Sequence, residues 1–330
     1  MTRIGVVAIG RNEGARLERC LDSAVGGERT VVYVDSGSTD ASIANARRRG
    51  AEVVELSPRE PFTAARARNA GFARLCEIDP SVEWVQFVDG DCEIVPAWWE
   101  TIGRWLPGPS EVAAVCGRRR ERHPEASIYS RLCDLEWETP IGAAKSCGGD
   151  ALMRVAAFRS VGGFDARVIA GEEPELCFRL RARGFRIERL DSEMTLHDAA
   201  ILRFAQWWRR ALRAGHAYAE NFALHGEPPE RFRAREVGSI LVWGAGLPIA
   251  ALLAAPIVPV APLVALVLYA LLFVRIRRGR FAAGAAPRDA GLYAAFTVIG
   301  KWAEACGIAW YAWNRIRGRR TRLIEYKVTR

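Results

Sequence analysis

Short apolar runs alternate with segments of helical spacing in the N-terminal third of the chain, and this alternation limits the folds that the chain can adopt. The apolar runs cover residues 4–9, 30–34, 51–56 and 84–88. Helical spacing follows the first run, and an Ala- and Arg-rich segment over 64–76 precedes the fourth. Strands that alternate with helices favour right-handed βαβ units. We therefore expect an α/β, Rossmann-like fold with a mostly parallel sheet and flanking helices.

From about residue 112 the pattern is looser. Residues 112–116 are typical of a strand, and a charged stretch follows over 118–125. Residues 151–158 and 173–183 have the pattern of helices, and the apolar spacing over 202–220 predicts an amphipathic helix.

An uncharged stretch of 35 residues, 240–274, stands apart from this soluble part, and prolines at 248, 256, 259 and 262 interrupt it. A straight membrane span needs about 20 residues. We expect two short helices, 239–255 and 260–274, joined at a proline-rich turn. The arginines that follow at 275–280 mark the cytoplasmic side. The segment then enters and returns as a hairpin or re-entrant pair. The expected domains are 1–237, 238–280 and 281–330.

Residues 291–313 are apolar but contain Lys301 and Glu304, and basic clusters flank them at 275–280 and 315–322. Tryptophans at 302, 310 and 313 share a face at helical spacing. These features favour a helix that lies in the membrane interface. A soluble amphipathic core helix is the alternative.

Composition limits the classes of binding partner and the cellular compartment that we expect for this chain. The net charge is +9, but the basic residues are scattered or flank apolar segments, and no nucleic-acid motif accompanies them. We expect a membrane surface and phosphate-bearing substrates instead, and no nucleic acid. The eight cysteines lack Cys-x-x-Cys or zinc spacing, which is typical of reduced thiols. The N-terminus is strand-like rather than a signal peptide, so we expect a cytoplasmic catalytic domain at the cell membrane.

Carboxylates stand where two of the expected strands end. Asp35 follows the second run, and Asp89 and Asp91 follow the fourth. Ligands of open α/β sheets collect at that edge, and Mg²⁺ or Mn²⁺ takes carboxylate oxygens and shares phosphates with a substrate. An Asp-x-Asp pair arises about once by chance in a chain of this length, so its position makes it informative. For Asp35, turn chemistry is the alternative.

Six segments in order carry a family resemblance. They are residues 8–13 (AIGRNE), 34–40 (VDSGSTD), 67–71 (ARNAG), 87–91 (FVDGD), 162–165 (GGFD) and 171–176 (GEEPEL). Together they resemble a family 2 glycosyltransferase of the GT-A fold and the membrane-associated bacterial type, over residues 3–215. The expected architecture is thus a GT-A domain followed by C-terminal membrane-associated helices.

The resemblance implies a role for each matched residue. Asp35 would contact the donor nucleoside, Glu13 would lie near the nucleotide, and Arg68 would reach the diphosphate. A salt bridge is the alternative for Arg68. Asp91 would bind the Mn²⁺ or Mg²⁺ ion that bridges the diphosphate, and Asp89 would contact the ribose or support the metal.

The same resemblance places the catalytic base at Glu173, where the family commonly has aspartate; its next acidic position is Glu175. Acidic residues that favour a helix dipole are the alternative. Glu93 is a secondary metal candidate. His197 either faces the site or is structural. Residues 206–210 (QWWRR) resemble an acceptor-holding motif of processive synthases, but arginine replaces its final tryptophan, and an amphipathic surface helix explains them equally well.

These inferences predict a metal-dependent, inverting glycosyltransferase. It would move a sugar from a UDP- or GDP-sugar to a lipid-linked or glycan acceptor in cell-envelope or exopolysaccharide synthesis. A nucleotidyltransferase is disfavoured, because the loop after the first run lacks the expected Gly-rich, basic sequence. A non-catalytic membrane scaffold or nucleotide-binding protein that keeps the fold is the other alternative.

Overall fold

The computed structural model describes residues 2–319, so most of the basic tail expected at the C-terminus lies outside the described residues. The chain forms two compact units. The first comprises the chain up to His123 and Glu136–Ala200; the second comprises Pro124–Leu135 and the chain from Ile201 onward.

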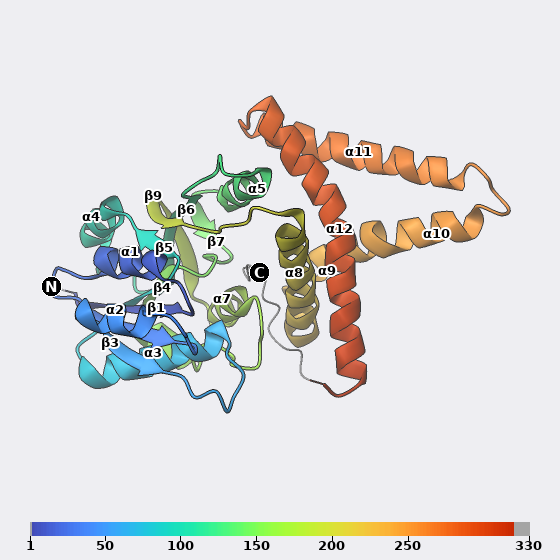
Figure 1. Cartoon of the computed structure of the whole chain (residues 1–330). Coiled ribbons are helices and arrows are strands. Elements are labelled where there is room, and N and C mark those ends of the chain that lie inside the picture. The colour runs from blue at the N-terminus through green and yellow to red at the C-terminus, as the bar shows by residue number, and fades with distance from the viewer. Residues whose placement is uncertain (1, 320–330) are drawn as a thin grey trace. The chain divides into compact units, whose positions relative to one another are not determined.

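A single sheet with helices around it forms the first unit (Figure 1). Its first elements are β1 (Ile4–Gly10), α1 (Ala15–Ala24), β2 (Thr30–Asp35), α2 (Ser42–Arg48), β3 (Glu52–Glu55), α3 (Ala64–Ile78) and β4 (Trp84–Asp89). They are followed by β5 (Cys92–Ile94), α4 (Pro96–Trp105), β6 (Val112–Glu121), α5 (Ile128–Trp137), β7 (Gly142–Ala144), β8 (Ala151–Arg154), α6 (Val155–Ser160), α7 (Glu172–Ala182) and β9 (Arg186–His197). Of these, α5 runs from the second unit into the first.

The strand order is β3-β2-β1-β4-β8-β6-β9-β5, with β7 paired to β9. The first four strands in this order are parallel. Beyond β4 the sheet is mixed: β8 is antiparallel to both its neighbours, β6 and β9 are parallel, and β5 and β7 are antiparallel to β9. The α/β class with a parallel first half is therefore confirmed, and the carboxyl ends of β1, β2 and β4 meet at one edge.

The prediction of a helix over residues 151–158 is wrong for the first half of this range. Ala151–Arg154 is strand β8, and the helix, α6, begins at Val155. Ala, Leu and Met favour helices, but β8 lies inside the sheet and pairs with β4 and β6. Tertiary pairing on both sides outweighs that intrinsic preference. The strand expected over 112–116 is longer, because β6 continues through the basic residues to Glu121.

Gly71, in the segment ARNAG, holds α3 close to the sheet. A Cβ atom at this position would lie 2.4 Å from Val7 Cγ1 and 2.8 Å from Val34 Cγ2. The glycine therefore lets α3 lie directly on β1 and β2 and fixes where Arg68, one turn earlier, meets the edge of the sheet.

Helices make up most of the second unit: α8 (Phe204–His225), α9 (Ala234–Leu241), α10 (Leu247–Ala254), α11 (Ala261–Ala282) and α12 (Pro287–Ile316), with a π-helical turn η1 (Val242–Gly246) between α9 and α10. The continuous helix Ala234–Ala254 begins earlier than the residue 239 expected. Helix α11 continues past residue 274 through the basic cluster, because arginine is a good helix former. Within the described residues, Ala234–Ala254 is the one helix long and apolar enough to cross a membrane.

Helices α8 and α12 touch through their backbones. A Cβ atom on Gly215 would lie 2.0 Å from the carbonyl oxygen of Glu304, and one on Gly307 would lie 2.1 Å from that of Leu212. The buried positions of α12 are small residues, Ala290, Ala294, Gly300, Ala303, Ala305 and Gly307. Its tryptophans at 302, 310 and 313 are exposed. The helix expected over 291–313 thus packs its small residues against neighbouring helices of the second unit, and its tryptophans are exposed.

Candidate active site

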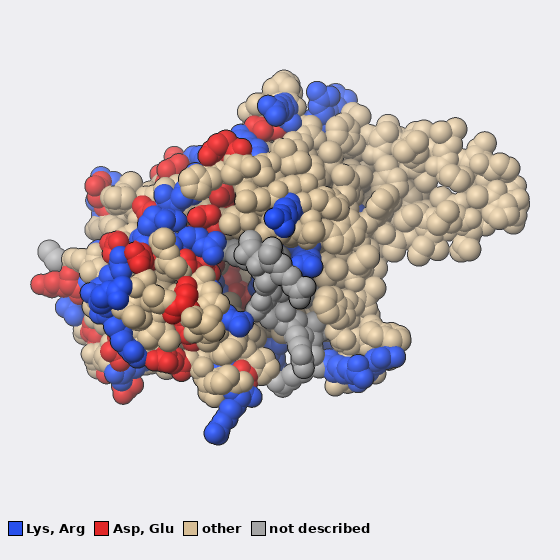
Figure 2. Space-filling model, in the orientation of Figure 1, with Lys and Arg blue, Asp and Glu red and all other residues tan. Residues whose placement is uncertain are grey.

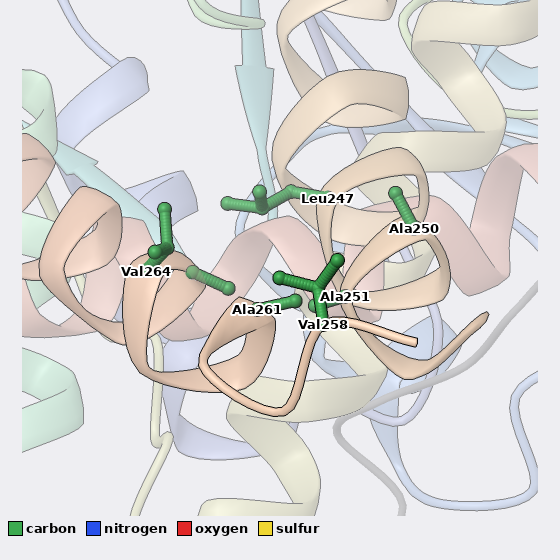
Figure 3. Close-up of a pocket in the computed structure, with 7 residues that line it drawn as sticks. Leu247, Ala250, Ala251, Val258, Ala261 and Val264 are labelled. Atoms are coloured by element: carbon green, nitrogen blue, oxygen red, sulfur yellow. The ribbon is translucent and has the colours of Figure 1, made fainter. Parts of the chain in front are cut away.

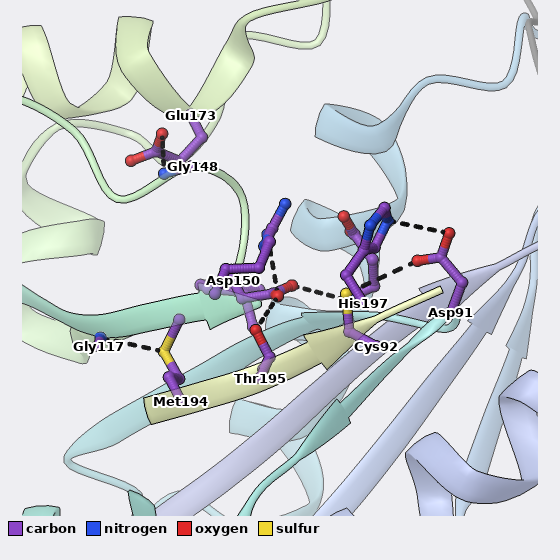
Figure 4. Close-up of polar contacts among 12 residues, drawn as sticks. Asp91, Cys92, Gly117, Gly148, Asp150, Glu173, Met194, Thr195 and His197 are labelled. Atoms are coloured by element: carbon purple, nitrogen blue, oxygen red, sulfur yellow. Dashed lines mark hydrogen bonds and ion pairs between the residues drawn. The ribbon is translucent and has the colours of Figure 1, made fainter. Parts of the chain in front are cut away.

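Asp91 and His197 meet at the end of β9. Asp91 directly precedes β5, which pairs antiparallel with β9 so that Cys92 lies opposite His197. Asp91 Oδ2 is 3.3 Å from His197 Nε2, and both side chains are buried (Figure 4). A shared cation about 2.1 Å from each atom fits a pair at this separation. The two residues therefore match the donor set of a divalent metal site.

Glu121 lies behind His197. Its Oε2 is 3.7 Å from His197 Nδ1, which is longer than a hydrogen bond. The Glu121 carboxylate accepts hydrogen bonds from the backbone N–H groups of His123 and Ala199. A carboxylate in this position orients an imidazole whose other nitrogen faces a metal. No local pattern in the sequence predicts Glu121, which lies in a charged stretch.

Asp150 supports the loop that carries Asp89. The Asp150 carboxylate accepts the backbone N–H of Asp89 (3.0 Å) and the hydroxyl of Thr195 (2.8 Å), and it pairs with Arg119 Nη2 at 2.9 Å. Its side chain is fully buried. No local pattern predicts Asp150 either, since its partners come from β4, β6 and β9 and leave no spacing to detect.

Arg68 is buried between two carboxylates. Its Nη2 lies 2.7 Å from Asp89 Oδ1 and its Nη1 lies 2.5 Å from Glu172 Oε1. Burial lowers the pKa of Arg68, but the two carboxylates raise it more, so the guanidinium stays charged. This ion-pair geometry joins α3, β4 and α7. A contact between Arg68 and a diphosphate stays a prediction, and it would require these pairs to open.

Glu173 lies in the first turn of α7. Its carboxylate accepts the backbone N–H groups of Cys147 (2.7 Å) and Gly148 (2.9 Å) and the Cys177 thiol (2.9 Å). Figure 4 shows it beside Gly148. The structure therefore fixes the carboxylate of Glu173 in one orientation. By contrast, Glu175 pairs with Arg179 at 2.7 Å along the same helix.

Asp35 closes the turn after β2. It accepts hydrogen bonds from the backbone N–H groups of Gly37 and Ser38 and from the Tyr33 hydroxyl. Burial, and then the Asp35 carboxylate, raise the pKa of Tyr33, so its hydroxyl remains a donor. The turn is tied to the loop after β1, because Asn12 Oδ1 accepts the Thr39 N–H at 2.7 Å.

Two further predicted residues have partners of their own. Glu13 Oε2 lies 2.8 Å from Arg16 Nη2 in the loop after β1. Glu93 pairs with Arg122, and it lies on the opposite face of β5 from the buried Cys92 and Ile94.

Comparison with known proteins shows a resemblance to one family. Residues 6–157 match the model for glycosyl transferase family 2. The matched residues make up slightly less than half of the chain, and they are similar to members of that family. A pre-mycofactocin glycosyltransferase of Mycobacterium tuberculosis (strain H37Rv) is 29% identical over 208 residues, which cover 59% of this chain and 42% of that protein. A TPR repeat-containing protein of Synechococcus elongatus is 29% identical over 135 residues, 41% of this chain and 32% of that protein. The chain thus spans about a third to two-fifths of the length of these curated relatives.

A solved structure confirms the GT-A fold. Mannosyltransferase PcManGT from Pyrobaculum calidifontis, solved with GDP-Man and Mn²⁺, is 20% identical with a TM-score of 0.64. The match covers 95% of this chain and 88% of that one.

The glycosyl transferase family 2 match covers most of the predicted site. Glu13, Asp35, Arg68, Asp89 and Asp91 lie inside residues 6–157. Glu173 and His197 lie beyond the match, so their assignment depends on the geometry around them.

Proposed function

We propose that the chain is a metal-dependent, inverting glycosyltransferase that uses a nucleotide-diphosphate sugar. The match to glycosyl transferase family 2 supports the general class. The observation that carries the finer proposal is the buried pair of Asp91 and His197 beside Asp89, at the carboxyl edge of the sheet.

Asp91 and His197 would hold the cation. Their donor set, one carboxylate and one imidazole, favours Mn²⁺ over Mg²⁺, because Mg²⁺ takes mainly oxygen ligands. The Mn²⁺ and GDP-Man in the PcManGT structure support this choice. When bound, such an ion supplies positive charge to the leaving diphosphate. Glu121 would orient His197 from behind.

The donor would lie across three loops. In the register of the sheet, Gly10 is opposite Asp35, and Ile9 is opposite Asp89. Strands β1, β2 and β4 therefore end level with one another, and the loops that follow them begin at the same edge of the sheet. Asp35 would contact the nucleoside, with Glu13 nearby, and Asp89 would contact the ribose. Either UDP or GDP fits this arrangement.

Glu173 would act as the base. Its carboxylate would take the proton of the acceptor hydroxyl while that oxygen attacks the anomeric carbon and the nucleoside diphosphate leaves with the bonding electrons. This displacement inverts the anomeric centre. The backbone N–H groups of Cys147 and Gly148 hold the carboxylate in place for this step. With an ionised phosphate acceptor, Glu173 would only orient it.

We also propose that the enzyme acts at the cell membrane with its catalytic unit in the cytoplasm. The helix Ala234–Ala254 is long and apolar enough to cross a membrane, which supports membrane association. A membrane location favours a lipid-linked acceptor over a soluble glycan, in cell-envelope or exopolysaccharide synthesis.

The full chain, purified in detergent, tests this function. UDP- and GDP-sugars are screened with Mn²⁺ or Mg²⁺ for donor turnover and for a rise in melting temperature, since a ligand that binds the folded state stabilises it. Asp91→Ala should abolish both metal-dependent signals. Glu173→Gln should lower turnover by about 10²–10⁴-fold and keep the thermal shift.

Glu93→Gln is the matched control, because it removes a nearby carboxylate that pairs with Arg122 instead. If Asp91→Ala and Glu173→Gln both retain full turnover, the site assignment is wrong. A wild-type chain that binds nucleotide but turns over no donor would favour the nucleotide-binding scaffold.

A further inference from the structure

The segment from η1 to the first half of α11 exposes an extensive apolar surface. We call residues 242–274 the apolar arm. Leu252, Leu253 and Ile257 are 71%, 74% and 85% exposed. In Figure 2 the region of α10 and the first half of α11 is a continuous surface without acidic or basic side chains. The sequence agrees, since no charged residue occurs between Glu236 and Arg275. Soluble monomers rarely expose contiguous apolar surfaces of this extent.

Both ends of the apolar arm return to the same place. Helix α8, which precedes α9 and the arm, and helix α12, which follows the arm, touch backbone to backbone at Gly215 and Gly307. Gly244, where the arm begins, is equally close to α12, since a Cβ atom there would lie 2.0 Å from the Lys301 carbonyl oxygen. One crossing of a bilayer would separate α8 from α12. The arm must therefore cross twice or not cross at all.

The returning half is too short for a second crossing. The uncharged part of α11 runs over residues 261–274, and exposed arginines follow at 275, 277 and 278. At 1.5 Å per residue these 14 residues reach about 21 Å, against about 30 Å for the hydrocarbon core. Residues 255–260 at the tip (APIVPV) provide no polar side chain for the opposite headgroup layer.

The tip satisfies most of its backbone donors within the arm. The N–H groups of Ala255, Ile257, Val258 and Ala261 all donate to backbone carbonyls within the arm. Pro256 and Pro259 have no N–H group. Hydrocarbon offers no partner to a backbone donor, so a turn can lie there only if its donors are satisfied internally. Four of the five N–H groups over residues 255–261 meet this condition, which favours a position of the turn inside a bilayer.

The hydroxyl of Tyr269, on the arm, is also satisfied within the protein. The Tyr269 hydroxyl donates to the Trp243 carbonyl oxygen and accepts the indole N–H of Trp302 at 3.0 Å. Between α10 and α11 lies an open hollow of about 310 Å³ (Figure 3). Its lining is aliphatic: Leu247, Ala250, Ala251, Val258, Ala261, Val264 and Ala265. Lipid chains match the chemistry of this lining.

We propose that the apolar arm is a re-entrant hairpin, which enters and leaves the bilayer through one face and keeps its tip inside the hydrocarbon core. The occupant of its exposed surface is thus lipid. Arg275, Arg277 and Arg278 lie where the hairpin leaves the core, and they would face anionic headgroups. The inference deepens the membrane association in the proposed function and rests on it.

Single cysteines in sealed vesicles of phosphatidylethanolamine and phosphatidylglycerol test the topology. The background is Cys306→Ser, which removes the exposed native cysteine. Ile257→Cys reports on the tip, Ala283→Cys on the loop after α11, and Ser57→Cys on the catalytic unit. We expect an impermeant maleimide to label positions 57 and 283 from the same side. Position 257 should react from neither side, and only after detergent is added. A bimane at 257 should be quenched by lipids brominated on their acyl chains.

Two results would overturn the proposal. Labelling of position 257 from the side opposite to Ser57→Cys means that the hairpin spans the bilayer. Labelling from the same side means that the arm lies outside it. Donor turnover in detergent is measured on the same preparations, so a failure of the proposed chemistry is distinguishable from a failure of the topology.

A charge at the tip gives an independent test with a matched control. Ile257→Asp places a carboxylate in the hydrocarbon core and should weaken vesicle binding on the order of 100-fold, whereas Ile257→Ala should weaken it only a few-fold. Turnover in detergent should be unchanged in both. Equal vesicle binding by the two variants would contradict the re-entrant hairpin, since a tip in water tolerates aspartate.

Discussion

His197 Nε2 lies 3.3 Å from Asp91 Oδ2 across the pairing of β5 with β9. If the two atoms share a cation, each substitution should weaken binding of Mn²⁺, and nucleotide binding that needs no metal should persist. We expect Asp91→Ala to abolish Mn²⁺ binding and His197→Ala to raise its Kd at least 10-fold, by analogy with the loss at outer-shell partners. Titration of free Mn²⁺ by electron paramagnetic resonance measures both. His123→Ala removes an exposed histidine that follows β6, and it should have no effect.

Glu121 should act through His197 rather than on the substrate. We expect Glu121→Gln to reduce affinity for Mn²⁺ by about 10–100-fold, because the amide orients the imidazole less strongly than the carboxylate does. At saturating Mn²⁺ most of the turnover should return. A loss of turnover that excess metal does not restore would assign Glu121 a different role.

Asp150 should be important for stability as well as for the metal loop. Asp150→Asn leaves Arg119 buried without its counter-ion, and breaking a buried pair costs about 3–5 kcal/mol of unfolding free energy. The control is Asp191→Asn, which removes the partner of Arg118 at the surface, where the Asp191 side chain is 75% exposed. A surface pair contributes at most about 1 kcal/mol. Urea unfolding of both variants should differ by several kcal/mol; equal losses would contradict this account.

His216 makes stability depend on pH. Burial lowers its pKa to about 4, while an unfolded chain has a histidine pKa of about 6.5. Between these two pKa values the unfolded state binds more protons than the folded state. A fall in pH therefore stabilises the unfolded state and lowers the free energy of unfolding. The contribution of His216 is therefore fully present above pH 6.5 and is lost as pH falls towards 4, by up to about 3 kcal/mol. His216→Gln should flatten the melting temperature over this range; an unchanged slope would assign the pH dependence elsewhere.

The buried thiols near the site should be inert. Burial raises the pKa of Cys20 and of Cys92 well above the usual range. For Cys177 the hydrogen bond with Cys147 lowers the pKa, but burial and the Glu173 carboxylate raise it more, to about 12. Thiolates are the reactive form. Iodoacetamide at pH 8 should therefore modify exposed Cys306 in the native protein and leave these three unmodified, as read by mass spectrometry. Rapid modification of Cys177 would mean that α7 opens readily.

Local patterns predicted the part of the site that lies on consecutive strand ends. Asp35, Asp89 and Asp91 follow apolar runs, and parallel strands bring such ends to one edge. Glu121 and Asp150 lie on no such pattern. Their partners come from strands distant in sequence, and only the mixed half of the sheet brings them together. Because that half has no repeating βαβ order, spacing carries no information about its contacts.

The error at β8 has the same origin. Residues 151–154 have the composition of a helix, and only pairing with β4 and β6 makes them a strand. In the second unit, hydropathy predicted the hairpin but not where its helices begin and end. Gly244 lies against α12 inside the continuous helix Ala234–Ala254, a contact that hydropathy does not describe.

The close contact of α8 and η1 with α12 determines which positions in these helices can be substituted. At Gly215, Gly244 and Gly307 a carbonyl oxygen occupies the space of a side chain, so even alanine cannot be admitted without moving a helix. Elsewhere on these helices, exposed residues have no such constraint. A saturation-mutagenesis map of the second unit should therefore show these three glycines among its least tolerant positions, and natural drift should alter the exposed faces of these helices while leaving the glycines in place.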